Sequence, residues 1–339
     1  MASPMLRLLL VLIVAAGAAC SGRDAAVPPP VPPTPRDTIA RTEPSPAIPA
    51  APPASNTDTV QSIAPPTTPA VQTDSATTAT YDRILDAAAA QNVASRSYGE
   101  IVQWVGEQLL GRPYVAGLLD QTTDETLVVD LMRFDCVLYI ENVLAIARQI
   151  ALGERGVEGY VANVRALRYR GGAMDGYCSR LHYFTDWIRD NQARGTLRDV
   201  TAAIGGEAFD KRIDFMSTHR ESYAALASDS VYACIVGTES TLREHALSYL
   251  PQDRIAAAYG GMQPGDLVAT ATSIGGLDVT HTGFVHQTAE HTGFMHASLS
   301  SDAVKISPDL QAYVQGVRSQ VGVLIIRPVD PRATRRAAE

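Results

Sequence analysis

Residues 134–153, FDCVLYIENVLAIARQIALG, form the strongest helical pattern in the chain. Apolar side chains recur there at the spacing of one helix face, three or four residues apart: Val137, Ile140, Leu144, Ala147 and Ala151. Asp135 is placed to cap the start of this helix, and Gly153 to end it. Cys136 then lies in the first turn, where the helix dipole and free backbone amides favour a thiolate. A catalytic nucleophile and a buried structural cysteine are the two interpretations of this residue.

Other segments place helices early in the folded part of the chain and strands late. Helical spacing is present at 81–97, 97–111 and 177–195. From residue 265 onward the period changes to two, which predicts strands at 266–272, 278–287, 293–299 and 321–329. Helices followed by strands predict an α+β fold with an antiparallel sheet.

The first eighty residues differ in composition from the rest. Residues 1–20 have one arginine and a short apolar run, the arrangement of a secretory signal, and AAGAAC at its end resembles a bacterial lipobox. Cys20 would then carry lipid, and cleavage to a soluble exported protein is the alternative. Residues 21–80 are rich in Pro, Ala and Thr and predict a disordered tether. The sequence therefore predicts an exported, periplasmic protein with one folded domain at 81–330 and a polar tail at 331–339.

The net charge limits the kinds of partner that the protein can bind, and the cysteine count limits which cysteines can pair. The formal net charge is -8 with no basic stripe, which argues against binding to nucleic acid or an anionic membrane surface. Membrane contact is expected only through an N-terminal lipid anchor. If Cys20 is lipidated, three cysteines remain, so one stays unpaired within the molecule. Cys178 and Cys234 could form a disulfide, which would leave Cys136 free.

Four of the seven histidines lie in HTGFVHQTAEHTGFMH, residues 281–296. Histidines five residues apart do not share one face of a helix or strand, so no metal or other cofactor is expected. Folded as a hairpin with Gln287 opposite Thr292, the segment places His281 and His296 on one face as diagonal neighbours. That arrangement suits a base and the group that orients it. The other two histidines of the segment, His286 and His291, are expected to be ordinary surface residues.

Several blocks, in order, resemble the NlpC-type, papain-like peptidases of bacterial cell walls. These blocks are LLGRPYVAG, FDCVLYIENVLAIA, QPGDLVAT, THTGFV and FMHAS. Finer features, namely PYVAG, LRYRGG, SRLHYFTDW and GGLDVTHTGF, look like the branch of N-acetylmuramoyl-L-alanine amidase-like proteins. The resemblance implies an antiparallel sheet packed on the helix of the nucleophile, with additional helices around the cleft.

The resemblance also implies catalytic roles. Cys136 falls at the nucleophile, His281 at the general base and acid, and His296 at the third member that orients the base. Tyr114 falls where the superfamily has a tyrosine near the oxyanion. Leu138 departs from the pattern, since a threonine is expected two residues after the nucleophile.

Further residues are candidates for binding the acidic peptide or lactyl part of a muropeptide: Tyr169, Arg170, Arg180, His182 and Tyr183. The resemblance makes Asp135 a candidate for binding a substrate amine, as in superfamily relatives that trim free peptides. Arginine suits carboxylates because of its fork of donors. The alternatives are that SRLHYFTDW is an amphipathic helix with its polar face in solvent and that Asp135 only caps its helix. Asp278, just before the strand that carries His281, could support the strand turn or the site.

The implied activity is hydrolysis of the amide between N-acetylmuramic acid and L-alanine through a thioester. The alternatives are an endopeptidase that cuts between D-glutamate and the diamino acid of the stem peptide, an inactive relative that binds peptidoglycan, and a zinc amidase.

Overall fold

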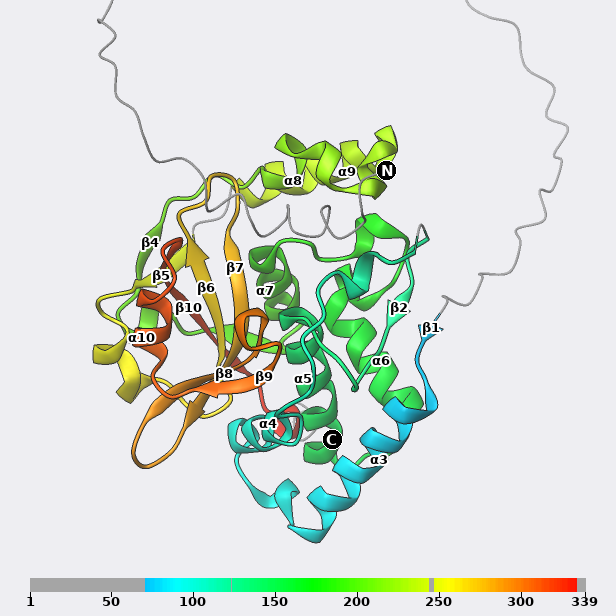
Figure 1. Ribbon diagram of the computed structural model, residues 1–339, viewed down its shortest axis with the longest axis vertical. Coiled ribbons are helices and arrows are strands. Elements are labelled where there is room, and N and C mark those ends of the chain that lie inside the picture. Colours follow the sequence, from blue (N-terminus) through cyan, green and yellow to red (C-terminus); the bar gives the residue numbers. More distant parts are fainter. Residues whose placement is uncertain (1–70, 123, 244–246, 334–339) are drawn as a thin grey trace, which may run out of the picture. The chain divides into compact units, whose positions relative to one another are not determined.

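The computed structural model describes residues 71–122, 124–243 and 247–333 (Figure 1). The predicted signal segment, Cys20, residues 21–70 of the predicted tether and residues 334–339 of the tail lie outside the described residues. The helices are α3 Ser75–Ala90, α4 Tyr98–Glu107, α5 Cys136–Leu152, α6 Val157–Arg168, α7 Phe184–Ala193, α8 Phe215–Thr218, α9 Asp229–Arg243 and α10 Leu310–Gln315. None of the helices in these ranges is both long and apolar enough to span a membrane.

One sheet contains most of the strands, and its neighbours run in the order β4-β5-β10-β6-β7-β8-β9, with β3 paired to β10. Every pairing in it is antiparallel. Its strands are β3 Leu197–Asp199, β4 Glu207–Phe209, β5 Leu247–Pro251, β6 Leu267–Thr272, β7 Val279–Gln287, β8 Thr292–Ser298, β9 Ala303–Ser307 and β10 Gln320–Pro328, while β1 Val71–Gln72 and β2 Leu127–Val128 form a separate parallel pair. The predicted combination of helices and an antiparallel sheet is confirmed, with the additional strands β3, β4, β5 and β9.

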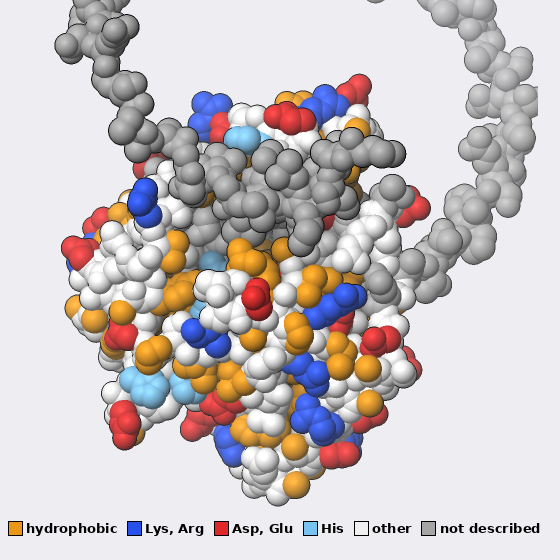
Figure 2. Space-filling view, in the orientation of Figure 1, with side chains coloured by type: hydrophobic (Ala, Val, Ile, Leu, Met, Phe, Trp, Pro, Cys, Tyr) orange, Lys and Arg blue, Asp and Glu red, His pale blue; other side chains and the backbone are white. Residues whose placement is uncertain are grey.

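The sheet is covered on both faces because its strands alternate between two cores. In β6, Leu267 and Ala269 belong to a core that includes α5, whereas Val268 belongs to a second core with Leu310 and Val314 of α10. Successive side chains of a strand point to opposite faces, which explains the alternation. Figure 1 accordingly shows the sheet between α5 and α10. On the surface drawn in Figure 2, acidic and basic side chains are interspersed.

The central helix α5 begins and ends as the sequence predicts. Asp135 accepts a hydrogen bond from the Leu138 amide at 2.7 Å, and Gly153 closes the helix in the left-handed conformation at φ 67°. A glycine suits that position because a Cβ there would be strained.

The same helix carries a buried charged network. Glu141 accepts hydrogen bonds from Arg168 of α6 at 2.7 Å and from Trp187 of α7 at 3.1 Å. The Arg168 and Glu141 side chains are only 2% and 0% exposed. These two hydrogen bonds to Glu141 therefore tie α5, α6 and α7 together inside the core.

Several predicted boundaries differ from the structure, and the helices predicted at 81–97 and 97–111 end early, at Ala90 and Glu107. The helix predicted at 177–195 begins only at Phe184, because Arg180 instead forms a bridge with Tyr169 and the intervening residues are extended. The carboxylate of Asp278 accepts hydrogen bonds from the amide and hydroxyl of Thr185, both at 2.8 Å, and so anchors the first turn of α7 to the start of β7. At the N-terminal side, α3 begins at Ser75, inside the segment predicted as tether.

Replacing Arg168 by methionine should lower the free energy of unfolding by about 3–5 kcal/mol, because the change leaves the Glu141 carboxylate buried without its charged partner. Arg155→Met is the matched control, since this arginine and its partner Asp86 are both solvent-exposed and exposed pairs add little to stability. Urea denaturation of both variants measures the difference. Equal losses of stability would contradict the structural role assigned to the buried pair.

Candidate active site

The free thiol lies where helix α5 meets strand β7. Cys136 is the first residue of α5 and is half-buried. The backbone N–H of Thr282 in β7 faces its sulfur and favours the thiolate form. Leu138, the departure from the family pattern, is fully buried and packs in the core. Segments separated by more than a hundred residues in the sequence therefore meet at one sulfur.

The two predicted histidines are in direct contact. The hairpin pairs Gln287 with Thr292 and Val285 with Phe294, which confirms the predicted register. In this arrangement Nε2 of His281 lies 2.8 Å from Nδ1 of His296. The planes of the two rings are nearly perpendicular, at 85°. The geometry fits one imidazole that holds the other by a hydrogen bond.

Glycine at position 283 makes this contact sterically allowed. A Cβ built on Gly283 would lie 2.8 Å from the Cβ of His296 and 2.5 Å from the carbonyl oxygen of Met295. Real Cβ atoms do not approach backbone that closely. The absence of a side chain therefore lets β7 and β8 come together beside the two imidazoles.

Burial sets the ionisation of the site. Together with the neighbouring Asp135 carboxylate, it raises the pKa of the Cys136 thiol to about 12, against the smaller opposing effect of the backbone amides. Burial likewise lowers the pKa of His281 to about 4. The helix-start amides favour a thiolate, as expected, but burial and the Asp135 carboxylate outweigh them and keep the thiol protonated in the free protein. Thiol and imidazole are both neutral near pH 7.

Two tyrosine hydroxyls lie within electrostatic range of the sulfur. Tyr114 is held by its backbone, whose amide donates to the carbonyl of Asp302 at 2.9 Å, and by a bridge to Phe134. Burial raises the pKa of its hydroxyl, and the nearby Cys136 raises it further, so the phenol stays protonated as a donor. The second hydroxyl belongs to Tyr313 of α10. Burial, with a smaller contribution from Cys136, raises the pKa of Tyr313 to about 12.

Sequence reasoning missed Tyr313. Its ring centroid lies 4.7 Å from that of His296 and 6.1 Å from that of His281. The segment LQAYVQ does indicate a short helix, because Leu310 and Val314 have helical spacing. That short segment says nothing by itself about which side chains Tyr313 meets.

The residues predicted to bind substrate have protein partners. Arg180 contacts Asp120 at 2.5 Å, Arg170 pairs with Asp186 at 2.6 Å, and the Tyr169 hydroxyl donates to Glu125 at 2.8 Å. His182 is bonded through Nε2 to the carbonyl of Tyr177 at 2.8 Å, and Tyr183 donates to Glu239 at 2.7 Å. Residues 180–183 are not helical, so they do not form the solvent-facing helix considered as an alternative. Their role in substrate binding stays a prediction.

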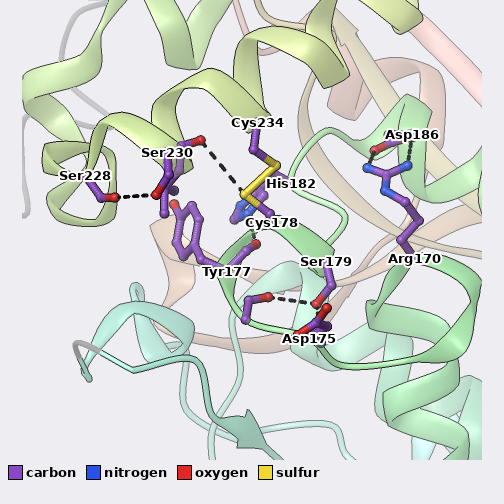
Figure 3. The surroundings of a disulfide bond; sticks show 12 residues. Arg170, Asp175, Tyr177, Cys178, Ser179, His182, Asp186, Ser228, Ser230 and Cys234 are labelled. Carbon is purple, nitrogen blue, oxygen red and sulfur yellow. Dashed lines mark hydrogen bonds and ion pairs between the residues drawn. A yellow bond between two sulfur atoms is a disulfide. The ribbon is translucent and has the colours of Figure 1, made fainter. Parts of the chain in front are cut away.

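Cys178 and Cys234 form a disulfide, the pairing that the sequence left open. The bond joins the turn Tyr177–Ser179 to helix α9. Figure 3 shows His182 beside this bond and Arg170 directed toward Asp186. Cys136 is left as the free cysteine of the described chain.

The other two histidines of the hairpin segment differ from each other. His286 is buried, with Nε2 3.1 Å from Oε1 of Glu107 on α4, so the expectation of an ordinary surface residue is wrong for it. The strand face opposite His281 is covered by helices rather than solvent. His291 is exposed in the turn, as expected. Within residues 71–122, 124–243 and 247–333, no three His, Cys, Asp or Glu side chains are grouped as a metal site requires.

Comparison with known proteins gives the family of this chain. Residues 104–322 match the AmiA-like family, described as N-acetylmuramoyl-L-alanine amidase-like. The chain belongs to this amidase-like family. A solved N-acetylmuramoyl-L-alanine amidase from Bacteroides uniformis ATCC 8492 is 31% identical, with a TM-score of 0.65 and an alignment that covers 69% of this chain and 100% of that one.

Two further solved structures resemble this amidase-like protein. A putative xylanase from Bacteroides fragilis is 31% identical, with a TM-score of 0.62 and coverage of 66% of this chain and 98% of that one. A Legionella pneumophila protein is 17% identical, with a TM-score of 0.54 and coverage of 75% and 94%, and shares the fold alone. A search of curated proteins found no match.

Replacing Gly283 by alanine should lower the free energy of unfolding by about 1–3 kcal/mol, the usual cost of overpacking, and should lengthen the contact between His281 and His296. Gly237→Ala is the control, because a Cβ there meets open space on helix α9. Urea denaturation and a crystal structure of each variant test this. An alanine at 283 that leaves both stability and the histidine contact unchanged would refute the steric argument.

Proposed function

We propose that this amidase-like protein is a cysteine hydrolase that cleaves the amide between N-acetylmuramic acid and L-alanine in peptidoglycan fragments. The observation that carries the proposal is the 2.8 Å contact of His281 with His296, together with a half-buried free thiol at a helix start. A nucleophile, a base and a group that orients the base are the parts that acyl transfer requires. The family match and the printed activity of the Bacteroides uniformis protein support this choice of substrate.

The reaction starts from the neutral pair. Nε2 of His281 is bonded to His296, so Nδ1 is the nitrogen left to take the proton of the Cys136 thiol. The sulfur attacks the lactyl carbonyl carbon as that proton moves to Nδ1. The amide of Cys136 and the Tyr114 hydroxyl donate to the oxyanion that forms.

Collapse of this intermediate breaks the carbon–nitrogen bond. His281 returns its proton to the departing L-alanine nitrogen, and the lactyl group remains on sulfur as a thioester. Water then attacks the thioester while His281 accepts a proton from it, and the sulfur leaves and regains its proton. The products are a muramic acid with a free lactyl carboxylate and a stem peptide with a free amine.

We also propose that the domain has the NlpC-type, papain-like architecture. The order of the parts supports this assignment, since the cysteine begins a helix and two histidines follow on neighbouring antiparallel strands. Export to the periplasm, with a lipid on Cys20 and a tether behind it, is part of the same proposal. It places the domain where peptidoglycan fragments occur.

Cys136→Ala should abolish turnover while leaving the fold intact, because no other described group can form the thioester. His281→Ala should lose activity similarly, and His296→Ala should keep a measurable residual rate, because an orienting group contributes less than the base. The measurement is mass spectrometry of defined muropeptides treated with the full chain. Release of sugar with an unsubstituted lactyl group, together with the intact stem peptide, is the expected result.

The same product masses separate the competing activities. Cleavage between D-glutamate and the diamino acid would leave L-alanine on the sugar and would exclude the amidase reaction. Binding without any product would favour an inactive peptidoglycan-binding protein. Full activity of Cys136→Ala would rule out the cysteine mechanism, and loss of wild-type activity on adding a chelator would point to a zinc amidase. His291→Ala is the control variant, since its side chain is exposed in the turn.

The value of kcat/KM should stay high down to about pH 5 and fall as the pH drops through about 4. Burial lowers the pKa of His281 to about 4, so the ring keeps its lone pair at pH values where an ordinary histidine is protonated. Only below that value does a proton occupy the nitrogen that must accept from the thiol. Initial rates between pH 3.5 and 8, with circular dichroism to verify folding, measure the profile. An acid limb centred near pH 6.5 would contradict it.

A further inference from the structure

A third residue extends the histidine contact away from the cysteine. Ser307, in β9, has its Oγ 3.2 Å from Nε2 of His296. Nδ1 of that ring is already engaged by Nε2 of His281 at 2.8 Å. The three side chains therefore form a hydrogen-bonded series across strands β7, β8 and β9, in which both nitrogens of His296 have partners.

We propose that Ser307 is a positioning residue that selects the tautomer of both histidines, an inference that rests on the proposed function. To accept the thiol proton, His281 must carry a lone pair on Nδ1 and therefore its own proton on Nε2. That proton is donated to Nδ1 of His296, which must then be unprotonated. A neutral His296 consequently carries its proton on Nε2 and donates it to the Ser307 hydroxyl oxygen.

The surroundings of His296 keep the ring neutral, so the tautomer is the variable that matters. The ring stacks on Phe294 at 4.5 Å with an interplanar angle of 10° and contacts Tyr313 of α10. Burial, with smaller contributions from His281 and then Lys305 of β9, lowers its pKa to about 2. Aromatic faces hold the ring in place without distinguishing its two nitrogens. Ser307 supplies that distinction.

Loss of the serine hydroxyl changes which nitrogen is protonated. A buried Nε2–H without an acceptor is disfavoured, so the proton moves to Nδ1 of His296. Nδ1–H then faces Nε2–H of His281, and two donors cannot form a hydrogen bond. His281 relieves this conflict by moving its proton to Nδ1, the nitrogen that must be free to accept from Cys136.

Ser307→Thr and Ser307→Val form an isosteric pair that tests the hydroxyl alone. The threonine variant should retain kcat, and the valine variant should lose roughly 10- to 100-fold of it with KM little changed, the loss seen when a partner that orients a histidine is removed. Ser307→Ala, which adds no bulk, should match valine. Ser300→Ala is the control, because that exposed hydroxyl bonds, among the described residues, to Ser298 rather than to the histidines.

A spectroscopic measurement separates this role from simple packing. Long-range proton–nitrogen correlation spectra of the full chain, labelled at histidine and assigned with His296→Asn, report which ring nitrogen carries the proton. Wild type and Ser307→Thr should show His296 protonated on Nε2, and Ser307→Val should show a shift toward Nδ1. Unchanged tautomers or a wild-type kcat in the valine variant would overturn the inference.

The outcome is distinguishable from failure of the proposed function. The spectra require no substrate, so they test the tautomers even if the wild-type protein does not cleave the muropeptide. Conversely, active wild type, inactive Cys136→Ala and fully active Ser307→Val would refute the role of Ser307 and leave the cysteine mechanism in place.

Discussion

The close approach of strands β7 and β8 beside Gly283 is the constraint on which the site depends. The missing side chain allows the backbone and Cβ of β8 to lie where any other residue would place its own Cβ. As a result His281 and His296, on two neighbouring strands, come within hydrogen-bond distance of each other. A wider hairpin would keep both histidines on the same face and still separate them, since side chains across a pair are several ångströms apart by default.

Desolvation then decides what kind of chemistry the site performs. The helix start of α5 would by itself favour a thiolate, but burial and the adjacent Asp135 carboxylate act in the opposite direction and prevail. The same burial keeps His281 unprotonated. A site of two neutral groups works by transferring a proton during attack, so the correct histidine tautomer is a requirement from the first step. This gives the hydrogen bonds beyond His281 a direct bearing on reactivity.

The region around residues 119–125 and 168–186 illustrates a different use of charged side chains. Its arginines and tyrosines were attractive candidates for recognising an acidic ligand, yet Arg180 and Tyr169 converge on Glu125, and Arg170 binds Asp186. A buried arginine needs a carboxylate partner because an unpaired buried charge is costly. The Cys178–Cys234 bond adds a covalent link from this region to α9. These interactions hold together the segments on this side of α5.

Local pattern alone determined the helix of Cys136, its Asp135 cap and the register of the hairpin with His281 and His296. These features follow from periods of 3.6 and two residues and from short-range capping, which a sequence carries directly. Tertiary structure alone decided that the Thr282 amide faces the sulfur, that Tyr313 and Ser307 join the histidines, and that Arg180 is occupied by carboxylates. It also set the direction of the Cys136 and His281 pKa changes, because desolvation depends on what packs around a group from distant parts of the chain.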